Sequence, residues 1–251
     1  MPSALITGAT VGIGAAFARR LASEGFDLVL VARDAERLEL AAREHRERHS
    51  VLVEVLPADL ATDEGIADVE ARLANGVDLL VNNAGLGQQG DFQTTQTADE
   101  LAMLRLHCEA VLRLSKAVLP SMLHRQRGQI INVASVSAFF SRGTYSASKA
   151  WVVTFSDSIR NQLADTGVHA MALCPGWVRT EFHERSGMST DSIPSFLWID
   201  ADRLVDQALR DVRRGTAVSI PGVSYKILVG LAKVLPRSLT TRLSARAGSH
   251  H

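Results

Sequence analysis

The sequence predicts an α/β fold, a doubly wound sheet of about seven parallel strands with helices on both faces. Short apolar runs rich in β-branched residues alternate with segments of helical period, which is the pattern of repeated β-α-β units. These runs lack strict polar alternation, as expected for strands that helices cover on both faces. No internal repeat, low-complexity tract or Pro/Gly-rich linker interrupts this order, so we expect a single domain over residues 1–247.

The predicted elements alternate along the chain. We expect strands near residues 3–7, 27–32, 51–56, 78–82, 128–134, 168–174 and 216–220. We expect helices near residues 12–24, 34–49, 63–74, 97–124, 144–166 and 200–214. Residues 248–251 resemble the remnant of an affinity tag and are left out of this assignment.

The composition excludes several classes of protein. Lys plus Arg equals Asp plus Glu at 27 each, so no global charge favours nucleic acid. No segment is apolar over the roughly 18 residues that a membrane span needs, and we expect no transmembrane segment or secretory leader. Cys108 and Cys174 have no metal-ligand spacing and form no disulfide framework, so we expect no metal site and a cytoplasmic location.

A loop with three glycines follows the first strand. Gly8, Gly12 and Gly14 have the spacing G-x-x-x-G-x-G, which differs from the commoner G-x-G-x-x-G fingerprint. Glycines at a strand-to-helix turn let the backbone approach a phosphate closely while N–H groups at the helix start point at the anion. The loop is therefore either a dinucleotide site or a tight turn without a ligand.

The second strand ends in Ala32, Arg33 and Asp34. In a dinucleotide site this position contacts the adenosine ribose, where an acid accepts the 2′-hydroxyl bonds of NAD and an Arg accommodates the 2′-phosphate of NADP. Arg33 therefore favours NADP(H) over NAD(H). The alternatives are that Arg33 only pairs with Asp34 or Glu36, or that Asp34 selects NAD.

Polar groups and a glycine also follow the third and fourth strands, at Asp59, Asn82, Asn83 and Gly85. The carboxyl ends of parallel strands are where such sheets bind ligands. The alternatives are structural, since Asp59 could begin a turn and the two Asn residues could brace neighbouring backbone.

Tyr145 and Lys149 lie four residues apart in a predicted helix, so their side chains project from one face, one turn apart. A nearby cation favours a phenolate, and we expect Lys149 to draw the pKa of Tyr145 toward neutrality. Tyr145 is therefore a candidate proton donor or acceptor for a substrate oxygen. Ser135, at the end of the fifth strand, could donate to the same oxygen. After the sixth strand a turn begins at Pro175, and Thr180 beyond it could bond a carboxamide.

Together these motifs resemble the short-chain dehydrogenase/reductase family, in its NADP-preferring form. The resemblance runs from Leu5 to Thr180 and consists of the T-G-x-x-x-G-x-G loop, the N-N-A-G strand end, the Ser, the Y-x-x-x-K pair and the P-G-x-x-x-T turn, in that order. It implies a Rossmann-type sheet, a nicotinamide cofactor and hydride transfer to a carbonyl or from an alcohol. It also implies a homodimer or homotetramer.

The resemblance implies a role for each matching residue. Tyr145 would be the general acid/base, Lys149 would lower its pKa and hold the nicotinamide ribose, and Ser135 would orient the substrate oxygen. The residues implied to bind the cofactor, besides Tyr145 and Lys149, are Gly8, Thr10, Gly12, Ile13, Gly14, Arg33, Asp59, Leu60, Asn83, Ala84, Gly85, Pro175, Gly176, Val178 and Thr180.

Two positions depart from the family pattern. Where the family usually has an Asn that anchors a water of the proton relay, this chain has His107, which either holds that water, relays a proton or is a core histidine without a role. The span from Ser135 to Tyr145 is also shorter than is usual, which leaves Ser137 as an alternative to Ser135.

Two segments are expected to lie near the substrate. Residues 181–214 are predicted to form a substrate flap. The apolar content of residues 181–200 suggests a hydrophobic substrate, although these side chains could instead pack on the sheet. Residues 223–247 form a tail of apolar and basic residues, which is a lid helix, a dimer surface or a membrane-surface helix.

The sequence thus predicts an NADP(H)-dependent oxidoreductase, of the class acting on CH–OH or C=O groups, for a small to medium hydrophobic carbonyl or alcohol. The alternative is a sensor or regulatory protein that binds NADP(H) without useful catalysis, which His107 and the short span after Ser135 would suit.

Overall fold

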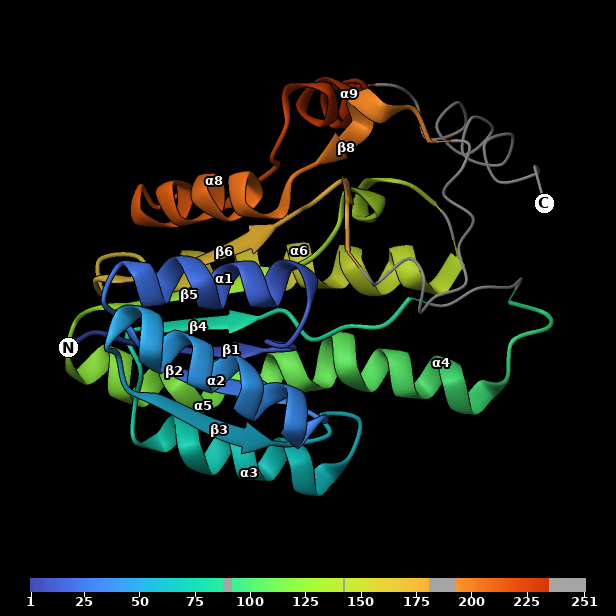
Figure 1. Ribbon diagram of the computed structural model, residues 1–251. Coiled ribbons are helices and arrows are strands. Elements are labelled where there is room, and N and C mark those ends of the chain that lie inside the picture. Colours follow the sequence, from blue (N-terminus) through green and yellow to red (C-terminus); the bar gives the residue numbers. More distant parts are fainter. Residues whose placement is uncertain (88–91, 142, 181–192, 235–251) are drawn as a thin grey trace.

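The computed structural model describes residues 1–87, 92–141, 143–180 and 193–234. Its centre is a seven-stranded parallel sheet in the order β3-β2-β1-β4-β5-β6-β9 (Figure 1). The strands are β1 (Ser3–Thr7), β2 (Asp27–Ala32), β3 (Val53–Pro57), β4 (Leu79–Asn82), β5 (Gly128–Val133), β6 (Val168–Leu173) and β9 (Val218–Ser219). The strand order changes direction between β1 and β4, which makes the fold a Rossmann-type α/β fold with its switch point beside β1.

Helices cover both faces of the sheet. They are α1 (Gly12–Ser23), α2 (Ala35–His49), α3 (Asp63–Ala74), α4 (Thr97–Leu104), α5 (Ala110–His124), α6 (Gly143–Gln162), α8 (Ala201–Arg213) and α9 (Val223–Val234). The apolar faces of α1, α2 and α8 pack on one side of the sheet, and those of α3, α5 and α6 pack on the other. Two short strands, β7 (Trp177–Val178) and β8 (Trp198–Ile199), pair separately from the main sheet.

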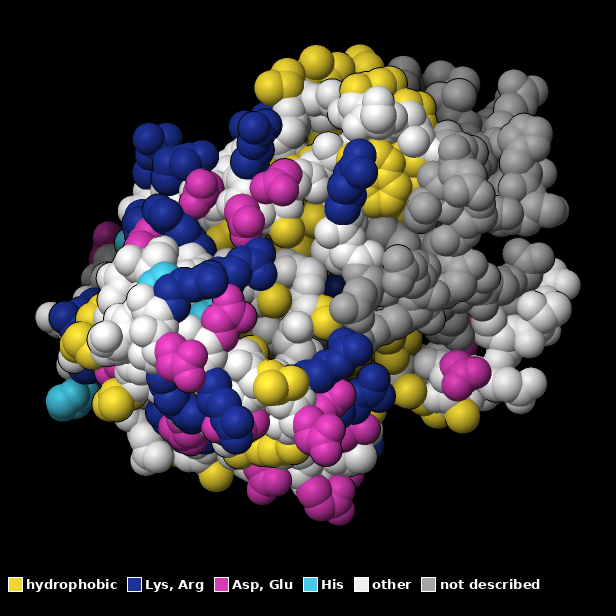
Figure 2. Space-filling model, viewed as in Figure 1, with side chains coloured by type: hydrophobic (Ala, Val, Ile, Leu, Met, Phe, Trp, Pro, Cys, Tyr) yellow, Lys and Arg dark blue, Asp and Glu magenta, His cyan; other side chains and the backbone are white. Residues whose placement is uncertain are grey.

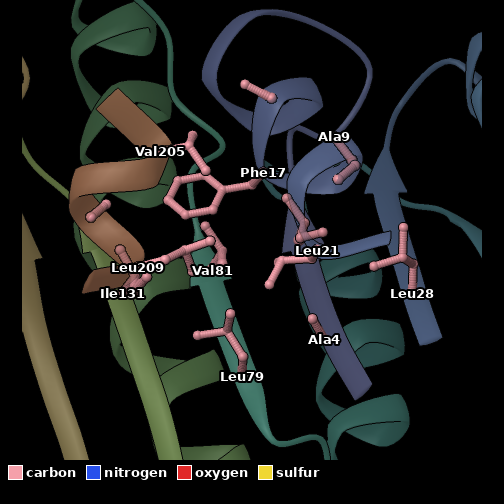
Figure 3. Packing of buried hydrophobic residues seen from close by; sticks show 14 of the residues in the cluster. Ala4, Ala9, Phe17, Leu21, Leu28, Leu79, Val81, Ile131, Val205 and Leu209 are labelled. Carbon is pink, nitrogen blue, oxygen red and sulfur yellow. The ribbon is translucent and has the colours of Figure 1, made fainter. Parts of the chain in front are cut away.

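The core on the first face forms where α1 and α8 lie side by side. Phe17 of α1 is fully buried, and Figure 3 shows its ring directed toward Val205 of α8 and toward Val81 of β4. Leu209, one turn beyond Val205, contacts the same cluster near Ile131 of β5. Burial of a side chain of this size contributes about 1.5–3 kcal/mol, so these contacts hold α8 firmly on the sheet.

Side-chain caps define several helix starts. Asp34 Oδ1 accepts the N–H of Arg37 at 3.0 Å at the start of α2. Thr62 Oγ1 accepts the N–H of Gly65 at 3.1 Å at the start of α3. Asp200 in the same way precedes α8. Short oxygen-bearing side chains at these positions satisfy N–H groups that the helix itself leaves without partners.

The predicted fold class is confirmed, and the predicted elements match the observed ones to within a few residues at their ends. The predicted helix at 97–124 is instead two helices joined by a π-helical turn, Arg105–Glu109, which contains His107. Such turns widen a helix locally and often occur at functional sites.

The predicted flap over residues 181–214 is wrong in its second half. Residues 201–213 form α8, whose Leu204, Leu209 and Val212 are buried in the core. The separate prediction of a helix near 200–214 is the one that holds there. Residues 181–192, 235–247 and 248–251 lie outside the described residues. Among the helices that the structure describes, none is both long and apolar enough to cross a membrane.

Candidate active site

A cavity of ≈ 1170 Å³ lies along the carboxyl ends of the strands, at the switch point of the sheet. Of the cofactor-binding residues expected from the sequence, all except Gly14 line this cavity, including Tyr145 and Lys149. Ser135 and its alternative Ser137 also line it, whereas His107 does not. Residues from six strand ends and from α6 therefore meet in one space, although they are spread from Gly8 to Thr180.

The glycine loop is shaped by close backbone contacts. Gly8 and Gly12 have positive φ angles of 65° and 56°. A Cβ on Gly14 would lie 2.1 Å from Gly8 O, so Gly14 is required where α1 packs on the loop and does not face the cavity. Val11, which precedes α1, provides no side-chain cap. The cap position therefore gives the first N–H groups of α1 no side-chain acceptor.

Asn83 both braces this loop and lines the cavity. Its Nδ2 donates to Thr7 O at 2.9 Å and to Gly8 O at 3.2 Å, and its backbone N–H donates to Thr7 Oγ1 at 2.9 Å. Asn82 is buried instead, and its Nδ2 donates to Asn132 Oδ1 at 2.8 Å. The bracing alternative thus holds for both Asn residues, and only Asn83 also faces the cavity.

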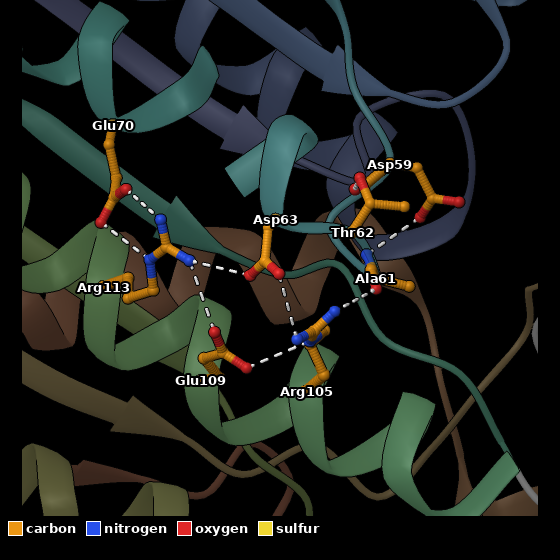
Figure 4. Close-up of polar contacts among 8 residues, drawn as sticks. All are labelled: Asp59, Ala61, Thr62, Asp63, Glu70, Arg105, Glu109 and Arg113. Atoms are coloured by element: carbon orange, nitrogen blue, oxygen red, sulfur yellow. Dashed lines mark hydrogen bonds and ion pairs between the residues drawn. The ribbon is translucent and has the colours of Figure 1, made fainter. Parts of the chain in front are cut away.

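Asp59 begins a turn, as the structural alternative predicted, and still lines the cavity. Its Oδ1 accepts the N–H of Ala61 at 3.0 Å, and its carbonyl accepts the hydroxyl of Thr62 at 2.9 Å. Arg105 of the π-helical turn donates to Ala61 O at 3.3 Å (Figure 4). The surrounding ion pairs join Arg105 and Arg113 to Asp63, Glu70 and Glu109.

Arg33 lies exposed at the end of β2 and lines the cavity. Among the described residues it forms no ion pair, so the expected alternative of a pair with Asp34 or Glu36 is absent there. Asp34 instead caps α2 and pairs with Arg37, with 3.6 Å between Oδ2 and Nε. Arg37 also lines the cavity and was not expected from the sequence.

Tyr145, Lys149 and Ser135 form a cluster inside the cavity. Tyr145 and Lys149 lie one turn apart on α6, as predicted, with Lys149 Nζ 5.8 Å from the centroid of the tyrosine ring. The Ser135 side chain forms a hydrogen bond with the Tyr145 hydroxyl. Ser135 Oγ also accepts the N–H of Ser137 at 3.1 Å, which holds it at the start of a short 3₁₀ turn. Despite the short span between them, Ser135 thus reaches Tyr145.

The electrostatics of the cluster differ from expectation. Burial raises the pKa of Tyr145 to about 12, although the hydrogen bond with Ser135 opposes the rise. Burial lowers the pKa of Lys149 to about 8. The expectation that Lys149 draws the pKa of Tyr145 toward neutrality is wrong for this structure. Burial of the phenol dominates, and the ammonium donates at 3.0 Å to the carbonyl of Val133.

His107 lies behind the cavity wall, buried against Gly85. Its Nε2 accepts the N–H of Leu86 at 3.2 Å, so Nδ1 carries the proton and donates to Ser148 Oγ at 2.9 Å. Ser148 in turn donates to the carbonyl of Tyr145 at 2.8 Å. Burial, with Lys149 nearby, holds the pKa of His107 well below its usual value. Both ring nitrogens are engaged within the protein, as in a core histidine.

The far end of the cavity is apolar. Leu86, Phe140 and Leu197 line it, together with Leu228 and Leu231 of α9. Figure 2 shows hydrophobic side chains gathered over α9 at the top of the view, in contrast to the mixed charges over α2 and α3. The described part of the predicted tail therefore forms a cavity wall, which favours the lid alternative.

Tyr225 is the main residue of the site that the sequence did not reveal. It lines the cavity and bonds the backbone of Trp177, 48 residues away in the chain. No local motif marks such a contact. Ser148, by contrast, lies within the Tyr145–Lys149 stretch, and its position three residues after Tyr145 was a signal that it would bond that turn.

Comparisons with known proteins agree with this geometry. Residues 2–190 match the family described as short chain dehydrogenase. The ketoacyl reductase HetN of Nostoc sp. is 30% identical over 216 residues, which are 82% of this chain and 72% of that protein.

Two solved structures are similar over nearly the whole chain. A short-chain dehydrogenase from Sphingobium yanoikuyae, in complex with NADPH, has a TM-score of 0.86 and 36% identity, covering 93% of this chain and 94% of that one. A bulky-bulky ketone specific alcohol dehydrogenase from Comamonas testosteroni has a TM-score of 0.80 and 32% identity, covering 95% and 96%.

Proposed function

Because the chain belongs to the short-chain dehydrogenase/reductase family of oxidoreductases, we propose that it transfers a hydride between NADP(H) and a hydrophobic carbonyl or alcohol. The observation that carries this proposal is the cluster of Tyr145, Ser135 and Lys149 in the same cavity as the glycine loop. The apolar far end of the cavity supports a hydrophobic substrate, and the ketone-specific relative supports a carbonyl group.

Each residue of the cluster has a distinct task. Ser135 donates to the substrate oxygen and orients it toward Tyr145. Tyr145, with a pKa of about 12, is protonated at pH 7 and can give its proton to the oxygen of a carbonyl under reduction. Lys149, with a pKa of about 8, is mostly charged at pH 7, and its ammonium has the donors to hold the hydroxyls of the nicotinamide ribose beside Tyr145.

The cavity fits a dinucleotide phosphate. A Cβ at Gly12 would lie 2.8 Å from Thr180 Cγ2, so glycine here lets the loop pack closely against Thr180 at the edge of the cavity. Arg33, exposed at the rim, has the charge and planar donors to bind a 2′-phosphate. When bound, NADPH supplies the hydride from its nicotinamide ring. An NADPH complex of a relative also supports NADP(H).

The test is turnover of a panel of hydrophobic ketones and alcohols, followed by NADPH absorbance, with wild type and Tyr145→Phe. We expect wild type to oxidise NADPH with at least one ketone. Tyr145→Phe should bind NADPH with a nearly unchanged Kd but lose turnover by at least about a thousandfold, because the main loss is the transferable proton. A Tyr145→Phe variant with the wild-type kcat on a true substrate would refute the mechanism.

A sensor that binds NADP(H) without useful catalysis is the second candidate. The observation that favours it is His107, both of whose ring nitrogens are bonded within the protein, so that neither is left to hold a relay water. Tight NADPH binding by wild type with no turnover on the whole panel, together with a partner that binds only in the presence of NADPH, would favour the sensor.

We also propose that the protein is a cytoplasmic homo-oligomer. Cys108 and Cys174, both within the described part of the chain, form no disulfide, which suits a reducing compartment. Mass measurement by light scattering on the purified chain tests the oligomer, and a monomeric mass at micromolar concentration would contradict it.

A further inference from the structure

Tyr225 of α9 connects three segments that are remote in sequence. Its side chain is buried, with 3% exposure, and it lines the cavity. Its hydroxyl accepts the N–H of Trp177 at 3.0 Å and donates to the carbonyl of Leu197 at 2.6 Å. The amide can only donate and the carbonyl can only accept, so the single hydroxyl proton is used on Leu197.

These two bonds act on the ends of the small sheet formed by β7 and β8. Trp177 is the first residue of β7, and Leu197 directly precedes β8, where Trp177 pairs with Trp198. The hydroxyl therefore joins the backbones of β7 and of the residue before β8 at the end of this sheet where both strands begin. Val178, the next residue of β7, is 3% exposed and lines the cavity.

The ring of Tyr225 explains why residue 176 is a glycine. A Cβ on Gly176 would lie 2.0 Å from Cζ of Tyr225, and the three closest atoms to that Cβ all belong to the same ring. The φ angle of Gly176 lies outside the left-handed region, so its backbone would accept an L-residue. Contact with the ring is therefore what requires glycine here.

α9 is also part of the apolar wall of the cavity. Leu228 and Leu231 line the cavity from this helix and are 43% and 57% exposed, whereas Ile227, 59% exposed, does not line it. Besides Tyr225, the described part of α9 buries Val229. A displacement of the wall and a displacement of the Pro175–Val178 turn are thus linked through one phenol.

We propose that Tyr225 is a positioning residue that holds the Pro175–Val178 turn in place and couples it to the apolar wall formed by α9. The turn's task toward a nicotinamide rests on the proposed function, whereas the coupling itself does not. A hydrophobic substrate group that contacts Leu228 therefore contacts α9, the helix whose Tyr225 holds this turn in place. Recognition of the substrate and placement of the cofactor are therefore linked.

The first experiment removes only the hydroxyl, in Tyr225→Phe, with Ile227→Ala as the control on the exposed side of the same helix. We expect amide exchange at Trp177 to be about tenfold faster in Tyr225→Phe, the factor that corresponds to loss of one hydrogen bond. The Kd for NADPH should rise and kcat should fall by about the same factor, with little change for Ile227→Ala. Unchanged exchange together with unchanged Kd and kcat would overturn the proposal. A lower Tm with unchanged kinetic constants would show a merely structural role and would overturn it as well.

The second experiment is a double-mutant cycle between Gly176→Ala and Tyr225→Ala, read by NADPH Kd and by Tm. If the ring is what excludes a Cβ, Gly176→Ala should weaken binding about tenfold in wild type and have little effect once Tyr225 is Ala. An equal loss in both backgrounds would show that Gly176 is required for another reason, and the coupling would be refuted.

These readouts separate the two proposals. Wild type that fails to bind NADPH or to turn over any ketone would refute the proposed function. In that case exchange at Trp177 and the Tm cycle still decide whether Tyr225 couples the turn to α9, since neither needs cofactor or substrate.

Discussion

Replacing Lys149 with Met is expected to stabilise the protein while it removes the proposed activity. Lys149 is 5% exposed, and burial lowers its pKa from 10.5 to about 8. At pH 7 the folded chain therefore holds a charged ammonium in a place that favours the neutral form, at a cost of about 3 kcal/mol. Met cannot donate to the carbonyl of Val133, and this loss offsets about 1 kcal/mol of the gain. The expected net stabilisation at pH 7 is about 2 kcal/mol.

The dependence on pH gives the sharper test. Below pH 8 Lys149 is protonated in both the folded and the unfolded chain, so the full cost is present. Between pH 8 and 10.5 the unfolded chain still binds the proton that the folded chain has released, so the stability of wild type rises with pH. The rise from pH 7 to about pH 9.5 amounts to about 2 kcal/mol. The raised pKa of Tyr145 changes stability only above about pH 10, and it does so in both wild type and Lys149→Met.

The assay is urea unfolding of the cofactor-free protein, followed by tryptophan fluorescence at pH 7 and about pH 9.5. Lys149→Met should be the more stable protein at pH 7, and the difference should nearly vanish at the higher pH. Lys226→Met, which changes an exposed lysine of α9, serves as the control and should follow wild type at both values. The reasoning is refuted if Lys149→Met is less stable than wild type by the same amount at both pH values.

Three further outcomes are expected. Arg33→Ala should raise the Kd for NADPH at least about tenfold and leave that for NADH unchanged, because it removes only the partner of a 2′-phosphate; an equal loss for both would remove Arg33 from this task. Ser135→Ala should lower kcat about a hundredfold with the NADPH Kd unchanged, and a rise in KM alone would contradict its task of orienting the oxygen. Finally, kcat/KM should show no imidazole titration between about pH 6 and 8, because burial holds the pKa of His107 well below 6.5; a titration there that disappears in His107→Asn would contradict this.

Most of the fold was predictable because its signals are local. The alternation of apolar runs and helical periods set the strand and helix order, and capping side chains such as Asp34 and Thr62 lie where helices begin. The π-helical turn around His107 was not predictable. Its residues continue the helical period, and the contacts of His107 with Leu86 and Ser148 come from elsewhere in the chain.

The end of the predicted flap was also wrong because it depends on contacts that local sequence patterns do not contain. Residues 201–213 have a strongly amphipathic helical pattern, which is equally compatible with a lid and with a cover of the sheet. Only contact with Phe17 of α1 and with the strands beneath decides between them. The pKa of Tyr145 is a further case, because its sign depends on how deeply the phenol is buried, and spacing to Lys149 does not contain that information.

The sequence by itself determined the family resemblance, the glycine loop and the pairing of Tyr145 with Lys149, since helical period alone places residues four apart on one face. Tertiary structure alone decided which of these groups share a cavity, which protonation states burial favours, and that Tyr225 reaches the Pro175–Val178 turn. The physical reason is the distance along the chain over which each effect acts. Periodicity and turn chemistry act over a few residues, whereas desolvation and the bonds of Tyr225 depend on segments that only the folded chain brings together.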